Sequence, residues 1–290
     1  MTRELFVHLL PDLVQPERLE GAVAVVLDVL RASTTISHAL AAGAVAVLPC
    51  GTVDEARRIA ATFAPGTMLL GGERAGTLIE GFDLANSPTS FTPDVVAGKT
   101  IVFTTTNGTR ALQHARLARR RLIGAFVNLN AVLDVLVCET RPIHLLCAGT
   151  DGRITLEDCL CAGAMAFGFG LATEQAATTF DDQTQLAIRL YENCAADPAR
   201  FRDAMHTSRG GKNLYDLGLE VDIDIASRWD VLPVVPELMR ASGQIQPATD
   251  VAPIPKRWLR PPGEPDDTKL PLPTGAVSFP NSGERGVRIQ

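Results

Sequence analysis

The sequence lacks the features that would place it in a membrane or outside the cell. Its first ten residues show no basic start followed by a long apolar run and a small-residue cleavage site, so they do not resemble a signal peptide. No stretch approaches the roughly 20 uninterrupted apolar residues of a membrane-spanning helix. None of the six cysteines forms a Cys-x-x-Cys pair, which favours reduced thiols. We therefore expect a cytoplasmic protein without membrane contact.

Several catalytic and binding motifs are also missing. There is no Gly-x-x-x-x-Gly-Lys-Ser/Thr loop and no Gly-x-Gly-x-x-Gly between a strand and a helix, so ordinary nucleotide binding has no support. A Gly-x-Ser-x-Gly elbow and a His-Glu-x-x-His zinc helix are absent, and the five histidines are scattered. The net charge of −6 argues against nucleic acid as a partner but allows a small anion to bind at a local pair of arginines. A homodimer is an open alternative to a monomer.

Apolar runs alternate with helix-like patterns along most of the chain. Val23–Leu27 is apolar at every position, as is typical of a parallel strand buried on both faces. We expect strands at about 23–27, 44–48, 68–70, 100–104, 121–126 and 143–147, and helices at about 33–42, 52–63, from 109 onward and at 155–170. Thr52 and Thr155 stand where N-caps are expected. The alternation predicts an α/β fold with three α/β/α layers and a mostly parallel or mixed sheet.

The composition changes near residue 245. Nine of the 19 prolines lie between Pro247 and Pro280, with few apolar runs between them. We expect a catalytic α/β domain over residues 1–244 and an irregular or disordered extension over 245–290, which Trp258 and Leu259 would anchor. A length of 290 residues also allows two subdomains, with a split near residue 125.

The loop after the first clear strand is the strongest candidate for chemistry. Asp28 ends this buried strand, where a carboxylate is costly unless it is paired or bound to a metal. Arg31 offers a forked cation that suits phosphate or carboxylate. Ser33, Thr34 and Thr35 open a helix, whose free N–H groups favour an anion. The structural alternative is a plain helix cap in which Asp28 pairs with Arg31.

Two further loops follow the strands at 68–70 and 100–104. The first is rich in glycine and carries acids, a guanidinium and an amide. The second is a cluster of hydroxyls with an Asn-Gly turn, which makes a good cradle for an anion. Their candidate site residues are Glu73, Arg74, Asp83, Asn86, Thr105, Thr106, Asn107 and Gly108.

The loop after the strand at 143–147 has two interpretations. Cys147 and Arg153 have the spacing of cysteine-dependent phosphatases, but no histidine precedes Cys147 and no hydroxyl residue follows Arg153 directly. A buried, inert Cys147 is therefore favoured. Glu157 and Asp158, at the start of the next helix, are suitable oxygen ligands for a hard cation.

In this order, the loops resemble the 2-phosphosulfolactate phosphatase family of coenzyme M biosynthesis. The matching segments are DVLRASTT at 28–35, GERAG at 72–76, GFDLANSP at 81–88, TTNGT at 105–109, CAGTDGRITLEDCLCAG at 147–163 and SRGGKNLYDLGLEVDI at 208–223. Ala75 and Ala85 stand where the family pattern predicts glycine, and Ser227 where it predicts cysteine. The resemblance implies a magnesium-dependent phosphatase with a small phosphate ester of a 2-hydroxy acid as its partner.

The resemblance and the loops together predict roles for these residues. Arg31 and Arg74 would clamp the anionic groups of the substrate. Hydrogen-bond donors to the phosphate oxygens would be Ser33, Thr34, Thr35, Thr105, Thr106 and Asn107, and Asn86 and Gly108 would also bind the substrate. The Mg²⁺ ligands or water-activating base would be Asp28, Glu73 and Asp158, followed by Asp83 and Glu157. The nucleophile stays open between water, Asp28 and Cys147. An isomerase or lyase of a small phosphorylated acid, and a non-catalytic anion-binding module, are the other two classes.

Overall fold

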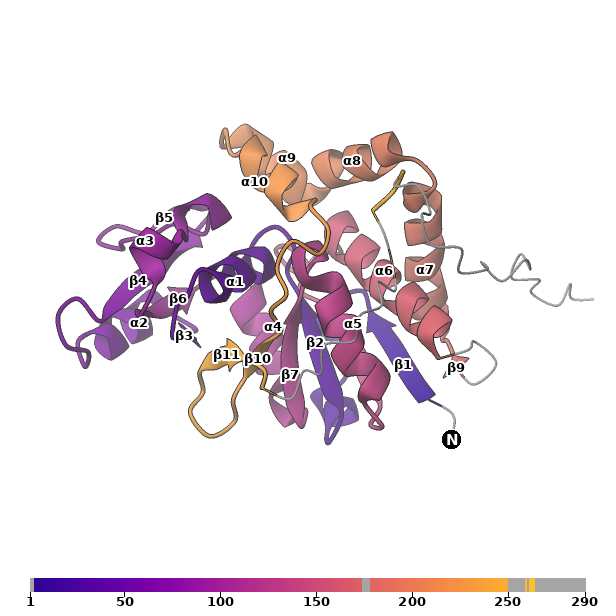
Figure 1. Cartoon of the computed structure of the whole chain (residues 1–290), viewed down its shortest axis with the longest axis horizontal. Coiled ribbons are helices and arrows are strands. Elements are labelled where there is room, and N and C mark those ends of the chain that lie inside the picture. The colour runs from indigo at the N-terminus through magenta and orange to yellow at the C-terminus, as the bar shows by residue number, and fades with distance from the viewer. Residues whose placement is uncertain (1–2, 174–177, 250–258, 260, 264–290) are drawn as a thin grey trace, which may run out of the picture.

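The computed structural model describes residues 3–173, 178–249, 259 and 261–263 (Figure 1). Its centre is an 11-stranded sheet in the order β5-β4-β6-β3-β11-β10-β7-β2-β8-β1-β9. The strands are β1 Arg3–His8, β2 Val23–Leu27, β3 Ala46–Pro49, β4 Met68–Arg74, β5 Thr77–Leu78, β6 Thr100–Thr104, β7 Arg120–Gly124, β8 Ile143–Cys147, β9 Thr178–Thr179, β10 Pro236–Leu238 and β11 Ile245–Pro247. The helices are α1 Ala32–Ala41, α2 Val53–Ala60, α3 Pro93–Val96, α4 Gly108–His114, α5 Leu129–Cys138, α6 Leu156–Ala172, α7 Asp182–Ala195, α8 Pro198–Thr207, α9 Arg209–Asp216 and α10 Glu220–Ala226.

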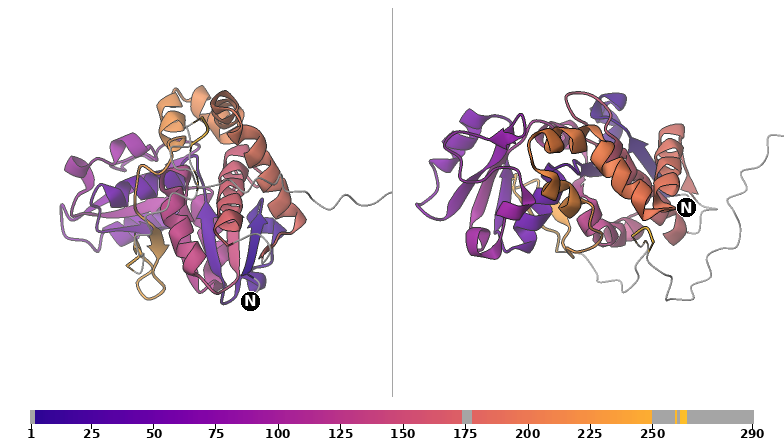
Figure 2. Two further views of the ribbon diagram at one scale, coloured as in Figure 1. Left: turned by 45° about the vertical axis from the view of Figure 1, so that its right-hand side comes forward. Right: turned by 90° about the horizontal axis from the view of Figure 1, so that it is seen from above.

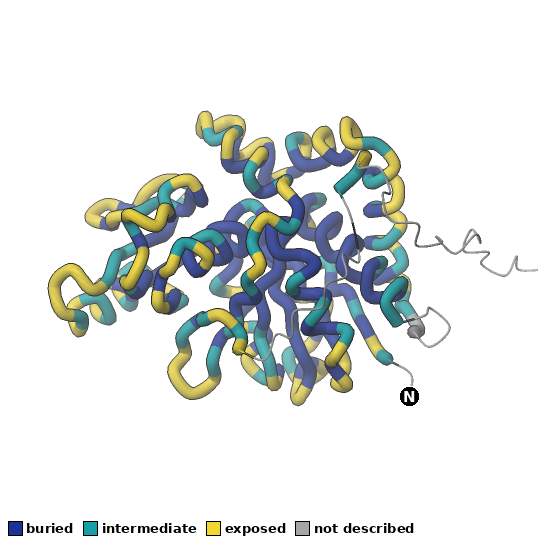
Figure 3. The backbone as a smooth tube through the Cα atoms, viewed as in Figure 1, coloured by how far each residue is buried: buried dark blue, intermediate teal, exposed yellow. Residues whose placement is uncertain are grey.

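The sheet lies between two layers of helices, as the alternation of patterns predicts. Strand β2 shows why, because Val23, Val25 and Leu27 pack with α5 and α6 on one face. Ala24 and Val26 face the opposite way and pack with α1 and α4. Every residue of β2 is buried, and the central strands form the dark interior of Figure 3. Two further views show helices on both sides of the sheet (Figure 2). The expected α/β/α fold is therefore confirmed.

The sheet is mixed, and the hairpin of β10 and β11 divides it. Both halves are mainly parallel, with pairs such as β2 with β7 and β8, and β6 with β3 and β4. The hairpin pairs antiparallel with β7 through Glu237 and Leu122, and with β3 through Ile245 and Val47. Strand β8 pairs with β1 and β2, so segments from both sides of residue 125 share one half of the sheet.

The strongest sequence patterns appear where they are expected. The strands at 23–27, 100–104 and 143–147 have the predicted bounds. Thr52 caps α2, since its side chain accepts a hydrogen bond from the N–H of Glu55 at 3.1 Å. Thr155 occupies the N-cap position of α6 without such a bond. The sequence patterns did not predict β1, α5, the helices α7–α10 or the hairpin.

The boundary expected near residue 245 falls within the sheet. Ile245–Pro247 forms β11, because this short segment completes the hairpin that joins the two halves. Leu259 is anchored as predicted, since its main-chain N–H and C=O bond the side chain of Asn130 at 3.1 and 2.9 Å. Trp258 and most of the predicted extension lie outside the described residues. Within the part of the chain that the structure describes, no helix is long and apolar enough to cross a bilayer.

Candidate active site

A cavity of about 600 Å³ lies where the loops after β2, β4, β6 and β8 meet. Helix α9, at the top of Figure 1, closes one side of it. Eight residues predicted from the sequence line this cavity: Asp28, Arg31, Glu73, Arg74, Asn86, Thr105, Thr106 and Asn107. The carboxyl ends of parallel strands share one edge of a sheet, which explains why loops so distant in sequence converge.

Asp28 lies directly after β2 and is 8% exposed. Burial, followed by the charges of Asp158 and Glu73, raises the pKa of its carboxyl to about 8. A β-carbon at Gly108 would stand 2.8 Å from Oδ2 of Asp28, so residue 108 has to be glycine to leave this carboxyl in place. Gly108, which was predicted to bind the substrate, does not line the cavity, and its lack of a side chain leaves room for the Asp28 carboxyl. Crowded acids with raised pKa values are typical of a site that takes up a proton or a cation.

Asp158 and Glu157 lie behind the cavity and do not line it. Asp158 accepts hydrogen bonds from the N–H of Val29 at 2.9 Å and of Gly149 at 3.0 Å, which ties the β2 loop to the β8 loop. Burial raises the pKa of both acids to about 7, and for Asp158 the charge of Glu157 is the next cause. One oxygen of Glu157 is buried without a hydrogen-bond partner among the described residues. The other lies against Gly210 of α9.

Arg31 does not pair with Asp28, so the pairing in the structural alternative is wrong, although Asp28 does accept a hydrogen bond from the N–H of Ala32, at the start of α1, at 3.4 Å. Its guanidinium donates to Asp222 of α10 at 2.8 Å and to the carbonyl of Gly76 at 2.8 Å. Asp222 is fully buried and also accepts from the hydroxyl of Ser87 at 2.6 Å. The guanidinium is thus fixed at the cavity wall by a partner from the far end of the chain.

Glu73 and Arg74 are the last two residues of β4, which is longer than the predicted strand at 68–70, and they connect this strand to the loop after β6. Glu73 accepts from the N–H of Gly76 at 2.7 Å and from the N–H and hydroxyl of Thr106 at 3.0 and 3.2 Å. Arg74 donates to the hydroxyl of Thr104 at 2.9 Å. Both charged groups therefore have fixed positions at the cavity.

The hydroxyls at the start of α1 do not reach the cavity. Ser33, Thr34 and Thr35 are buried, and none of them lines it. Ser33 donates to the main chain of β2 at 3.3 Å, Thr34 to the carbonyl of Val29 at 2.8 Å, and Thr35 to that of Asn86 at 3.4 Å. Their observed role is to fix the main chain around Asp28, because helix α1 begins at Ala32 and turns these side chains inward.

Two other predicted candidates also lie away from the cavity. Asp83 is exposed and accepts a hydrogen bond from the N–H of Leu70 at 2.7 Å, so it stabilises its own loop. Cys147 is fully buried at the end of β8. A hydrogen bond with Cys159, followed by burial, raises the pKa of the Cys147 thiol well above its usual value. A thiol in this state is a poor nucleophile, which agrees with the favoured interpretation of an inert cysteine.

Sequence reasoning missed the wall that α9 and the β8 loop provide. Five residues of α9 and its C-cap line the cavity: Gly210, Asn213, Leu214, Asp216 and Leu217. Thr150 and Asp151 line the cavity from the β8 loop, and Asp151 forms an ion pair with Arg209 at 3.0 Å. The segment at 208–223 is one of the segments that match the family, so its importance could be predicted. Its position could not, because it does not follow a strand whose end would place it at this edge of the sheet.

The acids do not form a protein cage for a metal. Among the described residues, no three His, Cys, Asp or Glu side chains are grouped closely enough to hold an ion. Mg²⁺, however, usually binds one or two carboxylates together with phosphate oxygens and water. Asp28 and Glu73 line the cavity, and the side-chain oxygens of Asn86 and Thr105 beside them are buried without a partner among the described residues. These oxygen ligands therefore fit a Mg²⁺ ion that takes its remaining ligands from phosphate and water.

Comparisons with known proteins point to one family. The family model described as 2-phosphosulpholactate phosphatase matches residues 8–241. A protein named probable 2-phosphosulfolactate phosphatase from Caldicellulosiruptor saccharolyticus is 39% identical over 225 residues, which cover 76% of this chain and 90% of that protein. Proteins of the same name from Caldanaerobacter subterraneus subsp. tengcongensis and Symbiobacterium thermophilum are 37% and 39% identical, covering 74% and 76% of this chain and 86% and 92% of theirs.

Proposed function

Because this chain belongs to the 2-phosphosulpholactate phosphatase family, we propose that it is a phosphoric monoester hydrolase acting on 2-phosphosulfolactate or a similar phosphate ester of a small 2-hydroxy acid. The products are the hydroxy acid and phosphate. The observation that carries this proposal is the single cavity wall shared by Asp28, Glu73, Arg31 and Arg74, which lies within the matched segment.

The substrate carries several negative charges, and the cavity offers matching donors. Arg74 presents its guanidinium from the end of β4. Arg31 presents the part of its guanidinium that bonds neither Asp222 nor the main chain. The Thr105 hydroxyl has no partner among the described residues and is available to donate to a substrate oxygen, whereas the unpartnered amide oxygen of Asn86 can accept from a hydroxyl group or bind a cation. Together they would bind and orient the ester.

We propose Mg²⁺ as the cofactor, with Asp28 as its first ligand and Glu73 as its second. A cation beside Asp28 would relieve the repulsion from Asp158 and Glu73 that raises the pKa of the Asp28 carboxyl. When bound, Mg²⁺ supplies positive charge to the phosphate oxygens and lowers the pKa of water.

Asp158 acts from behind the cavity by joining the β2 and β8 loops, Glu157 lies behind the cavity against Gly210, and Asp83 lies on an exposed loop outside it. The attacking group remains water or the carboxylate of Asp28, since Cys147 does not line the cavity.

The direct test is to measure phosphate release from 2-phosphosulfolactate and from 2-phospholactate, with Mg²⁺ and then with a chelator. We expect release with Mg²⁺ and its loss with the chelator. Turnover without phosphate release would indicate an isomerase or lyase, and binding without turnover would indicate a non-catalytic anion-binding module.

A matched pair of variants tests the site itself. Asp28→Asn is expected to lower kcat by about a hundredfold or more, because it removes a charged group at the reacting centre. Asp83→Asn removes the same charge from an exposed loop outside the cavity and should retain activity. Full activity of Asp28→Asn would contradict the assignment.

The proposal extends to the setting of the reaction. All six cysteines are free, and five of them are buried, which fits a reducing compartment such as the cytosol. A small phosphate ester is the proposed partner, whereas the absence of nucleic-acid binding and the alternative of a homodimer stay predictions from the sequence.

A further inference from the structure

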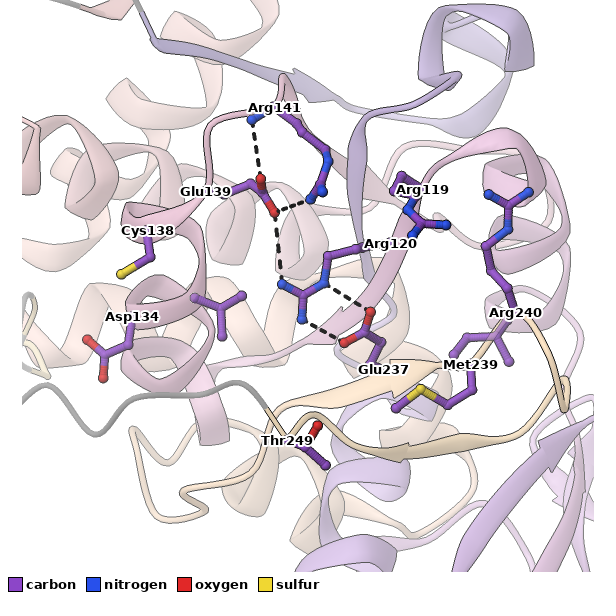
Figure 4. A pocket seen from close by; sticks show the side chains of 12 residues that line it. Arg119, Arg120, Asp134, Cys138, Glu139, Arg141, Glu237, Met239, Arg240 and Thr249 are labelled. Carbon is purple, nitrogen blue, oxygen red and sulfur yellow. Dashed lines mark hydrogen bonds and ion pairs between the residues drawn. The ribbon is translucent and has the colours of Figure 1, made fainter.

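A second cavity, of about 560 Å³, lies at the opposite edge of the sheet (Figure 4). It is formed by the start of β7, the last turns of α5, and β10 with the residues that follow it. The parallel strands β7 and β8 begin at this edge, whereas the active-site loops follow strand ends, and a strand of this length spans roughly 16 Å. Among the described residues, the two cavities have no lining side chain in common.

Part of the charge in this second cavity is already paired. Arg120 makes a forked contact with Glu237 of β10, at 3.0 Å from Nε and 2.7 Å from Nη2. Glu139 accepts from Arg141 at 2.8 Å and lies 3.9 Å from Arg120. Figure 4 shows these contacts as dashed lines along one wall. Glu139 and Glu237 are thus engaged by two arginines, and Asp134 of α5 is a third acid that lines the cavity.

Two further arginines of the cavity, Arg119 and Arg240, are exposed. Within the part of the chain that the structure describes, neither side chain makes a hydrogen bond or an ion pair, whereas the main-chain N–H of Arg119 donates to the carbonyl of Ala22 at 2.7 Å. Burial lowers the pKa of the neighbouring Arg121, and the charge of Arg240 lowers it further. The cavity wall thus carries four arginines and three acids, and the guanidinium groups of Arg119 and Arg240 can face a bound anion.

We propose that this cavity is a binding site for a small organic phosphate, held by the guanidinium groups of Arg119 and Arg240. A guanidinium matches phosphate oxygens through forked hydrogen bonds. The volume is in the range of pockets for small molecules, so a bare phosphate would leave most of it open. Val135, Leu238 and Met239 supply apolar lining for the organic part of the ligand.

The test is isothermal titration calorimetry of the full chain with two organic diphosphates, ADP and fructose 1,6-bisphosphate. The site variant is Arg119→Ala combined with Arg240→Ala, and the control is Arg58→Ala combined with Arg110→Ala. The control removes the same charge from exposed positions outside both cavities. A third variant, Arg74→Ala, weakens anion binding at the active site alone.

We expect at least one diphosphate to bind the wild type, the control and Arg74→Ala with similar affinity. Binding to the Arg119→Ala/Arg240→Ala variant should be weaker by about tenfold or more, because two charged contacts are lost. Pyrophosphate should bind more weakly than the organic ligand, and adenosine should not bind. Equal binding by the site variant, pyrophosphate as tight as the organic ligand, or no saturable binding of either diphosphate would each overturn the proposal.

Discussion

Replacing Asp222 by asparagine would remove the carboxylate that balances Arg31 inside the protein. The two groups are 2.8 Å apart, with exposed side-chain fractions of 4% for Arg31 and 0% for Asp222. Breaking a buried ion pair by neutralising one partner costs about 3–5 kcal/mol, because the remaining charge stays buried without compensation. For a chain of this size, such a loss lowers Tm by roughly 6–20 °C. Asparagine keeps the shape of the side chain, so no cavity adds to this cost.

Asp224, on the same helix, provides a matched control. Its side chain is 50% exposed and lies 3.5 Å from Arg202 and from His206. An exposed pair of this kind contributes about 0–1 kcal/mol, so Asp224→Asn should change the free energy of unfolding very little. Urea denaturation followed by circular dichroism measures both variants. Equal losses in Asp222→Asn and Asp224→Asn would refute the reasoning, since burial would then not decide the energy of the pair.

Three other outcomes are expected. Burial lowers the pKa of His8 and of His144 from 6.5 to about 4, so the unfolded chain takes up protons first and stability is lost as the pH falls from about 6.5 toward 4. At about pH 5 the loss of stability is about 2 kcal/mol per histidine. As the pH is lowered, the free energy of unfolding should therefore fall less steeply in His8→Gln/His144→Gln than in the wild type. Parallel plots of this free energy against pH would contradict the prediction. Cys147→Ala should keep its kcat within about a factor of two, and a large drop in phosphate release would restore the thiol as a nucleophile. Ala75→Gly should raise the free energy of unfolding by about 1 kcal/mol, because Ala75 has a φ of 51° in the left-handed region that favours glycine; a lower urea midpoint would show that the alanine is not strained.

The parts of the fold that the sequence predicts are those with strong local patterns. Val23–Leu27 is apolar throughout, and Thr52 stands three residues before Glu55, so the strand and the cap follow from neighbouring residues alone. The hairpin strands have three residues each, and Pro236–Leu238 contains a proline and a glutamate. No local pattern marks such a segment as a strand, because its place in the sheet depends on partners far away in the sequence.

The same distinction applies to the active site. Asp28, Glu73 and Thr105 are predictable because each lies at or directly after the end of a strand, and strand ends meet at one edge of a parallel sheet. The ion pair of Arg31 with Asp222 spans 191 residues, so no spacing rule reveals it. The hydroxyls that follow Arg31 were expected in the cavity, but the exact start of α1 decides which way they point, and helix ends are the least predictable part of a pattern.

The place of β10 and β11 has a consequence for how the chain is made. Synthesis runs from the first residue to the last, so the two halves of the sheet emerge before the hairpin that separates them. Until then, the inner edges of β3 and β7 have no partner from the hairpin. Open strand edges can pair with other chains, and contacts between distant segments form slowly. A nascent chain is therefore most exposed to wrong strand pairing between the synthesis of β8 and that of the hairpin.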